Sequence, residues 1–372
     1  MVDLVGQYKK IKTEVDNAVV EVMNNTSFVN GPAVHEFQKN FEEYLGVKHV
    51  IPCANGTDAL QVALMALDLK PGDEIITTSF TFIATAEVIA LLNLVPVLVD
   101  VLPDTYNIDP AAVEKAITSK TKAIIPVHLF GQSADIHELL KIAKEHNLYI
   151  VEDTAQAIGA DFTCPKSGDT KKIGTFGDIG CTSFFPSKNL GAFGDGGAIF
   201  TNDDDLAKKM RVIVNHGMTV RYYHDEIGVN SRLDSMQAAV LNIKLKHLNE
   251  YTKARQEAGA FYNNAFANHS KITPPVTANF TTHVYHQYTL VLTDVDREGL
   301  MKHLADKGIA SAVYYPVPLH MQKAYLDARY KEGDFPITEM LSKTVMSLPI
   351  HTELTPEIQK EITDAVLEFV DK

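Results

Sequence analysis

The sequence predicts an α/β protein in which a large domain, built on a mixed, mostly parallel sheet covered by helices, precedes a smaller C-terminal α/β domain. Short β-rich runs alternate with helical patterns between residues 48 and 205. Several of these runs are almost continuously apolar, which is typical of strands that helices cover on both faces. A long helical pattern without proline, residues 233–266, then separates them from a second set of strand and helix patterns.

Seven strands are expected in the first part, because each run is rich in β-branched or apolar residues and ends at turn residues. In chain order they are HVIPCA, DEIITTS, VPVLVDV, KAIIPVHL, LYIVEDTA, CTSFFP and GGAIFTN. Helices are expected between them, for example over residues 57–67 and 135–146.

After the long helix the chain continues with strand-like HVYHQYTLVLT, a helix at 296–307, strand-like IASAVYYP and a last helix after Pro356. We place the domain boundary inside the long helix, where no Gly-rich or Pro-rich linker marks it. The large domain is then expected at residues 1–247 and the small domain at residues 248–372.

Composition limits the function. The chain has 372 residues and a formal net charge of −13, which disfavours a general nucleic-acid binder, because such proteins cluster Lys and Arg. The N-terminal 16 residues lack an apolar export segment, and the longest apolar stretch, residues 86–101, is interrupted, so no membrane anchor is expected. Three cysteines without CxxC spacing indicate no disulfide framework and no metal site, and they fit a reducing cytoplasm.

A single lysine, Lys188, lies in the Pro- and Gly-flanked turn of TSFFPSKNLG, directly after an expected strand. Turns at strand ends are where α/β proteins place functional groups. Lys188 is therefore a candidate Schiff-base amine, and a merely solvated loop lysine is the alternative.

Asp153 ends the apolar run LYIVED, where its carboxylate would face the crevice at the carboxyl ends of the strands. A carboxylate there could keep a pyridine nitrogen protonated, as pyridoxal phosphate (PLP) requires. A helix N-cap is the alternative. The amide of Gln156, three residues on, could reach the same ring.

The segment Asn55-Gly56-Thr57-Asp58 follows one strand and opens a helix. Free amides at a helix N-terminus, together with a threonine hydroxyl, suit a phosphate group, although Asn55 and Asp58 would cap this helix without any ligand. Phe82 follows the next strand and could stack on a flat ring, with core packing as the alternative. Together these groups predict a PLP site.

The chain also resembles a known family. The segments CANGTDALQ, SFTFIATAE, PVHLFGQ, VEDTAQAIGA, SFFPSKNLGAFGDGGAIFTND, NHGM, VNSRLDSMQAAVL, YYPVPLH and MSLPIH, in this order, are similar to the successive signatures of the DegT/StrS sugar aminotransferases. These are fold-type-I PLP enzymes that act on nucleotide-linked keto-sugars. Within the family the likeness is greatest to enzymes that aminate C3 of a UDP-linked 3-keto-N-acetylglucosaminuronate.

The resemblance implies two groups of site residues. The implied cofactor contacts are Lys188 as the Schiff-base lysine, Asp153 at the pyridine nitrogen, Phe82 stacked on the ring, Gly56, Thr57 and Ser183 at the phosphate, Gln156 at the ring substituents or phosphate, and Asn230, which would reach the partner's PLP phosphate across a homodimer interface. The implied sugar-nucleotide contacts are Arg232, His320 and Tyr314.

The activity so implied is transfer of an amino group from L-glutamate to the sugar ketone by ping-pong kinetics, in the cytoplasm, for a surface polysaccharide or related glycan. Lys188 and the scarcity of cysteines exclude the family's dehydratase and iron–sulfur variants. Two alternatives stay open: an aminotransferase for another keto-sugar, including 4-keto and dTDP-linked ones, and a regulator that retains the fold without turnover.

Overall fold

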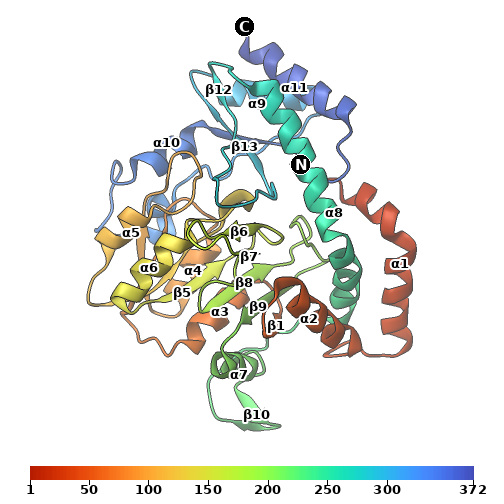
Figure 1. Ribbon diagram of the computed structural model, residues 1–372, viewed down its shortest axis with the longest axis vertical. Helices are drawn as coiled ribbons and strands as arrows, with labels where there is room; N and C mark the ends of the chain where they lie inside the picture. Colours follow the sequence, from red (N-terminus) through yellow and green to blue (C-terminus); the bar gives the residue numbers. More distant parts are fainter.

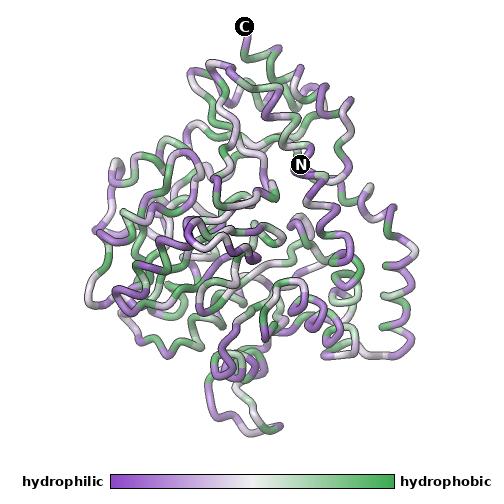
Figure 2. Tube along the Cα trace, in the orientation of Figure 1, coloured by the Kyte–Doolittle hydropathy of each residue, from purple (hydrophilic) through white to green (hydrophobic).

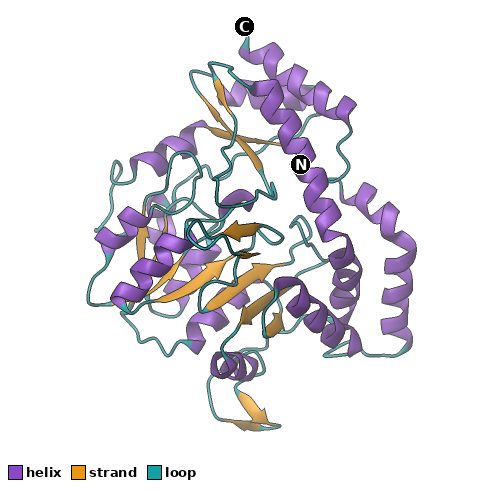
Figure 3. Ribbon diagram, viewed as in Figure 1, coloured by secondary structure: helices purple, strands orange, loops and turns teal.

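The expected sheet is present in the computed structural model, which describes all 372 residues. Its seven strands lie in the order β1 (His49–Cys53), β9 (Gly197–Thr201), β8 (Ile179–Ser183), β5 (Tyr149–Asp153), β4 (Thr121–Ile125), β2 (Glu74–Thr78) and β3 (Val95–Val99). Six of the strands run in one direction, and β9 runs antiparallel to both of its neighbours, β1 and β8. The prediction of a mixed, mostly parallel sheet covered by helices is confirmed (Figures 1 and 3).

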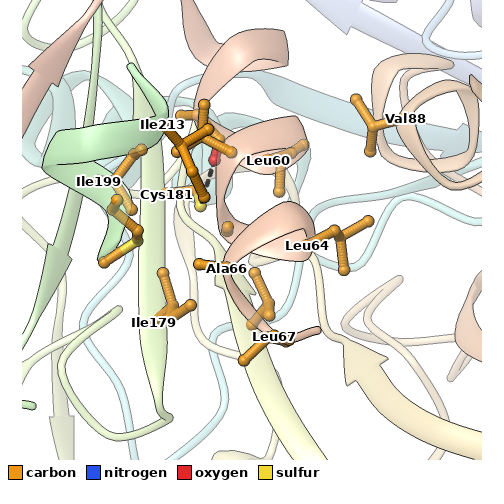
Figure 4. Close-up of a cluster of buried hydrophobic side chains, with 14 of the residues drawn as sticks. Leu60, Leu64, Ala66, Leu67, Val88, Ile179, Cys181, Ile199 and Ile213 are labelled. Carbon is orange, nitrogen blue, oxygen red and sulfur yellow. Dashed lines mark hydrogen bonds between the residues drawn. The ribbon is translucent and has the colours of Figure 1, made fainter. Parts of the chain in front are cut away.

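Successive residues of a strand point to opposite faces of the sheet, and each face is covered by helices. This explains why most of the strand sequences are largely apolar. Ile75 and Val151 belong to a core under α3 (Gly56–Ala66), α4 (Ala84–Leu91) and α7 (Asp204–Ile213). Figure 4 shows this core, in which Ile179, Cys181 and Ile199 of the sheet lie on one side of α3 and Leu64 of α3 points toward Val88 of α4 on the other side.

The other face of the sheet has two cores. Ile76 and Ile150 pack with α6 (Ile136–His146) and α5 (Pro110–Ala116). Val50 and Phe200 pack with α2 (Pro32–Leu45) and the first half of α8 (Ser235–Phe266). Helix α1 (Leu4–Asn24) lies outside, against α8.

Helix α8 connects the two parts of the chain. Its residues 238–248 pack in the core beside α2, whereas residues 258–266 pack in the C-terminal core. That core also contains β12 (Ile272–Thr273), β13 (Tyr288–Leu292), β14 (Val345–Leu348), α9 (Arg297–Asp306) and α11 (Pro356–Val370), seen at the top of Figure 1. We keep the boundary at residue 247 as a proposal, supported by this change of partners along α8.

The C-terminal helices have one buried face. In α11 the buried residues include Ile362, Val366 and Val370, at helical spacing. Figure 2 shows hydrophobic and hydrophilic residues alternating along this helix accordingly.

Two strand predictions need correction. IASAVYYP forms no strand: within it only Ala312 makes an isolated bridge, to Ser347, because β14 takes the place beside β13. In HVYHQYTLVLT the strand begins at Tyr288, since residues before it are held in a loop, where the Val284 amide donates to the Gly131 carbonyl over 2.8 Å.

The rest of the C-terminal segment folds back on the large domain. Leu319, in the short helix η2 (Leu319–Met321), packs with Leu98 of β3. Leu341, in α10 (Pro336–Thr344), packs with Phe80. The remaining short elements are η1 (Leu129–Gly131), η3 (Lys323–Tyr325), and the hairpins β6–β7 (Asp161–Thr163, Thr170–Lys172) and β10–β11 (Met218–Val220, Tyr223–His224). None of the helices has the length and apolar character needed to cross a membrane.

Candidate active site

A cavity of about 800 Å³ lies at the carboxyl ends of the parallel strands, the place where α/β sheets bind ligands. Most residues predicted for the site line it: Gly56, Thr57, Phe82, Asp153, Gln156, Ser183, Lys188 and Tyr314. Residues from five strand ends and two C-terminal loops thus meet at one place.

The N-terminus of α3 forms one wall of the cavity. The Asn55 side chain caps the helix by accepting a hydrogen bond from the Asp58 amide over 2.8 Å, while the amides of Gly56 and Thr57 precede the first intrahelical hydrogen bond. A Cβ on Gly56 would lie 2.6 Å from the Cβ of Ser183. Glycine is therefore needed at this position for the helix end and Ser183 to approach each other so closely.

Asp153, at the end of β5, is buried beside the cavity. Its Oδ2 accepts a hydrogen bond from the Thr85 hydroxyl over 2.9 Å, and its Oδ1 accepts from the Ala155 amide over 3.1 Å. Asp153 does not cap a helix. These two donors fix the carboxylate, and its cavity-facing side can receive a further N–H.

The Gln156 amide is held at both ends. Its Oε1 accepts from the Phe130 amide over 2.8 Å, and its Nε2 donates to the Tyr315 hydroxyl over 2.9 Å. Phe82 is 56% exposed, so the core-packing alternative does not hold; its ring faces the cavity and lies 6.3 Å from the Tyr315 ring, centroid to centroid.

The Lys188 turn is anchored on both sides. The Asn189 side chain donates to the Val284 carbonyl over 2.9 Å, and Lys244 of α8 donates to the Gly191 carbonyl over 2.5 Å. Burial lowers the pKa of Lys188 to about 8, against an opposing effect of the Asp153 charge. The amine is therefore much more often neutral near pH 7.5 than that of a solvated lysine.

The sequence interpretation missed several cavity residues: Thr81, Thr85, His286, Gln287 and Tyr315. Burial, with the charges of Lys188 and Arg255, holds the pKa of His286 well below its ordinary value, so the imidazole is neutral. Thr81, Thr85 and Tyr315 lie inside the segments SFTFIATAE and YYPVPLH that carry the family resemblance, but no local pattern singles them out. His286, Gln287 and Tyr315 lie in segments read as strands, where nothing marks a residue as facing a cavity.

Two of the predicted site residues, Asn230 and Arg232, lie together on one loop and do not line the cavity. Asn230 is exposed and bridges to Asn215, and Arg232 is half-buried. The loop is attached to the N-terminus of α3, because the Ser231 hydroxyl, between these two residues in the chain, donates to Asp58 over 2.6 Å and accepts from the Ala54 amide over 3.0 Å.

The structure contradicts the prediction that His320 contacts the sugar-nucleotide. His320 is buried and does not line the cavity. Its Nδ1 bonds the Ser79 hydroxyl over 2.8 Å and its Nε2 bonds Glu339 over 3.2 Å. With both ring nitrogens engaged inside the protein, it has no group left for a sugar-nucleotide.

These residues fit a phosphorylated pyridine ring. The α3 N-terminus offers an anion site, Asp153 offers an acceptor for a ring N–H, and Phe82 offers an aromatic face. Among the residues that line the cavity, the Thr81 hydroxyl and His286 Nδ1 are buried without a hydrogen-bond partner, and buried polar groups of this kind call for a polar ligand.

A half-buried lysine, a buried carboxylate and an open helix N-terminus lie together at the carboxyl ends of a mostly parallel sheet, and these are the groups that a PLP-dependent transferase uses to hold its cofactor. The chain belongs to the DegT/DnrJ/EryC1/StrS aminotransferase family, whose model matches residues 9–367. It is accordingly a PLP-dependent sugar aminotransferase, as the sequence resemblance implied.

Individual relatives cover nearly the whole chain. A "pleiotropic regulatory protein" of Geobacillus stearothermophilus is 46% identical over 99% of this chain and 98% of its own length. The UDP-2-acetamido-2-deoxy-3-oxo-D-glucuronate aminotransferase of Pseudomonas aeruginosa is 44% identical over 95% of each chain. The crystal structure of S. venezuelae DesV, in complex with a ketimine intermediate, superposes with a TM-score of 0.95, at 39% identity over 100% of this chain and 98% of that chain.

Proposed function

We propose that this enzyme transfers the amino group of L-glutamate to C3 of a UDP-linked 3-keto-N-acetylglucosaminuronate, for the synthesis of a surface polysaccharide or related glycan. The observation that carries the proposal is one cavity in which the Lys188 amine, the fixed Asp153 carboxylate, the α3 phosphate cradle and the exposed Phe82 ring converge. The name of the 44% identical Pseudomonas aeruginosa relative supports the choice of sugar.

PLP, when bound, supplies an electron sink that stabilises negative charge on the carbon next to the transferred nitrogen. Lys188 would hold the cofactor and, once displaced by an amine substrate, would move the proton at that carbon as base and then acid. Its lowered pKa suits this role, because a group that titrates near the working pH can both take up and release a proton.

Each of the other cavity residues would have a binding or orienting role. Asp153 would accept the pyridinium N–H and keep it protonated. Phe82 would cover one ring face. Gly56, Thr57 and Ser183 would donate hydrogen bonds to the phosphate, and the Gln156 amide, fixed by Phe130 and Tyr315, would lie against the ring.

The substrate contacts are proposed from Arg232 and Tyr314. Tyr314 lines the cavity, and no protein carboxylate pairs with the Arg232 guanidinium, which leaves it free for a carboxylate or phosphate of the substrate.

We also propose a homodimer, in which the exposed Asn230 reaches the partner's phosphate site. Three unpaired cysteines, two of them buried, fit an enzyme of the cytoplasm.

The sugar is tested by loading the protein with pyridoxamine phosphate and adding keto-sugars one at a time. Rapid return of the PLP absorbance with UDP-linked 3-keto-N-acetylglucosaminuronate, and at least about tenfold slower return with the 3-keto sugar that lacks the C6 carboxylate, would support the uronate. Faster return with a dTDP-linked or 4-keto sugar would replace it by the corresponding substrate.

The name of the Geobacillus stearothermophilus relative raises a second candidate, a regulator. A regulator without turnover would bind PLP or a nucleotide sugar but form no 2-oxoglutarate from glutamate. Formation of one 2-oxoglutarate per site would identify an aminotransferase and exclude a regulator without turnover, because this product forms only when the amino group of glutamate is transferred.

A further inference from the structure

The buried His320 lies in a three-residue network that links the large domain to the C-terminal segment. Ser79 follows β2, His320 lies in η2, and Glu339 lies in α10. Ser79 lies 241 residues before His320, whereas Glu339 follows His320 by 19 residues, so the network fixes a long-range contact between Ser79 and the C-terminal segment.

The hydrogen bonds of the network have one consistent direction. The Ser79 hydroxyl accepts from the His320 amide over 3.4 Å and is then free to donate to Nδ1. The Nε2–H of His320 donates to Glu339, which also accepts from the Gly333 amide over 2.8 Å. No buried side-chain polar atom of Ser79, His320 or Glu339 lacks a hydrogen-bond partner, which makes the network costly to break.

The order Ser–His–Glu is that of a nucleophilic triad, but burial excludes this chemistry. Ser79, His320 and Glu339 are 1%, 2% and 7% exposed, and the active-site cavity touches none of them. No substrate can reach the serine.

The network instead sits behind two walls of the cavity. Ser79 directly precedes the segment with Thr81 and Phe82, and η2 follows the loop with Tyr314 and Tyr315. The Leu319 amide also donates to the Ser79 carbonyl over 3.0 Å. The two walls also contact each other nearer the cavity. The Tyr315 ring centroid lies 6.1 Å from the Phe80 ring centroid and 6.3 Å from the Phe82 ring centroid.

We propose that His320 is a positioning residue of the aminotransferase site: held between Ser79 and Glu339, it fixes the Phe82 wall against the Tyr314–Tyr315 wall. The inference rests on the proposed function for its catalytic meaning, since Phe82 would stack on the cofactor. It differs from a direct substrate contact in one measurable way, because its effects arise before any substrate is present.

The test compares Ser79→Ala, His320→Phe and Glu339→Ala with wild type. Two measurements are made without substrate: hydrogen exchange of the segments 79–85 and 313–321 in the apoprotein, and PLP affinity with the visible circular dichroism of bound PLP. The matched control is His303→Phe on α9, whose ring packs on Phe369 away from the cavity.

We expect all three variants to exchange faster in both segments and to bind PLP about tenfold more weakly, the size of one lost buried hydrogen bond, with a reduced dichroic band. Ser79→Ala combined with His320→Phe should be no worse than His320→Phe alone, because both remove one interaction. The His303→Phe control should match wild type in both measurements.

The proposal is overturned if His320→Phe leaves exchange, PLP affinity and dichroism unchanged, and a raised KM for the sugar in that case would restore His320 as a substrate contact. If His320→Phe does not fold, His320→Asn, which retains a partner for Ser79, must show the same changes in weaker form. Should wild type bind no PLP, the proposed function fails, and hydrogen exchange alone still decides whether the walls are coupled.

Discussion

Individual residues of the site have properties that their local sequence does not specify. Lys188 is a lysine in a Gly-rich turn until the fold encloses it, and burial then lowers its pKa to about 8 from the ordinary 10.5. The charge of Asp153 opposes this shift, so burial is the larger effect.

The pKa of Lys188 predicts how the apoprotein captures PLP. Only the neutral amine attacks the aldehyde, so the capture rate should rise with pH and level off above about pH 8. Stopped-flow absorbance from pH 6 to 10 measures it, with a short lysine peptide as the control for ionisation of PLP itself. A rate that still rises tenfold per pH unit beyond pH 9 would contradict the buried-amine account.

Asp153→Asn should bind PLP yet lose at least about a hundredfold in the rate of the glutamate half-reaction, as removal of a fixed electrostatic contact to developing charge does. The amide retains a partner for Thr85 but no longer keeps the ring nitrogen protonated. An unchanged rate would mean that the carboxylate only completes a turn.

Sequence reasoning placed Lys188 and Asp153 correctly at the cavity, because Asp153 ends a strand and Lys188 lies in the Pro- and Gly-flanked turn that follows another, whereas it misplaced His320. A histidine in a loop gives no local sign of whether a serine and a glutamate from distant segments will enclose it. For the same reason His286 was missed, although it lines the cavity.

At the scale of elements, the prediction was most successful where an element is buried on both faces. Most of the sheet strands are largely apolar because alternate residues enter different cores. IASAVYYP shows the limit of this signal: an apolar run also suits a loop that packs inward, as Tyr315 does against Phe80.

The close approach of α3 and β8 predicts the effect of Gly56→Ala. The new Cβ would lie 2.6 Å from the Cβ of Ser183, so the helix end or the strand end must shift. We expect PLP affinity to fall at least about tenfold and stability to fall by about 1–3 kcal/mol. Titration of PLP and urea unfolding measure these, with Ser119→Ala, at an exposed residue away from the cavity, as the control. Unchanged affinity in Gly56→Ala would show that the amides at this helix end do not bind the phosphate.

At the scale of the whole molecule, α8 determines how the two parts are joined. One continuous helix enters two hydrophobic cores, and the segment with η2 and α10 returns to the large domain. Sequence patterns located the long helix but not this return, since the contacts between Asp100 and Thr338 join residues far apart in the chain.

The proposed dimer predicts complementation between two inactive variants. In a hybrid of a Lys188→Ala subunit and an Asn230→Ala subunit, one site has an intact Lys188 and receives Asn230 from the other subunit. Hybrids purified with two different tags should therefore regain about half of the wild-type activity per dimer. Hybrids no more active than the mean of the two parents would place Asn230 at its own subunit's site.

The most direct test of the account is one glutamate half-reaction without any sugar. The PLP-loaded protein is mixed with L-glutamate while absorbance and 2-oxoglutarate are followed. We expect one 2-oxoglutarate per site as the PLP absorbance disappears, and a loss of at least about a thousandfold in rate in Lys188→Ala. A wild-type protein that binds PLP but yields no 2-oxoglutarate, or a Lys188→Ala variant that reacts at the wild-type rate, would contradict it.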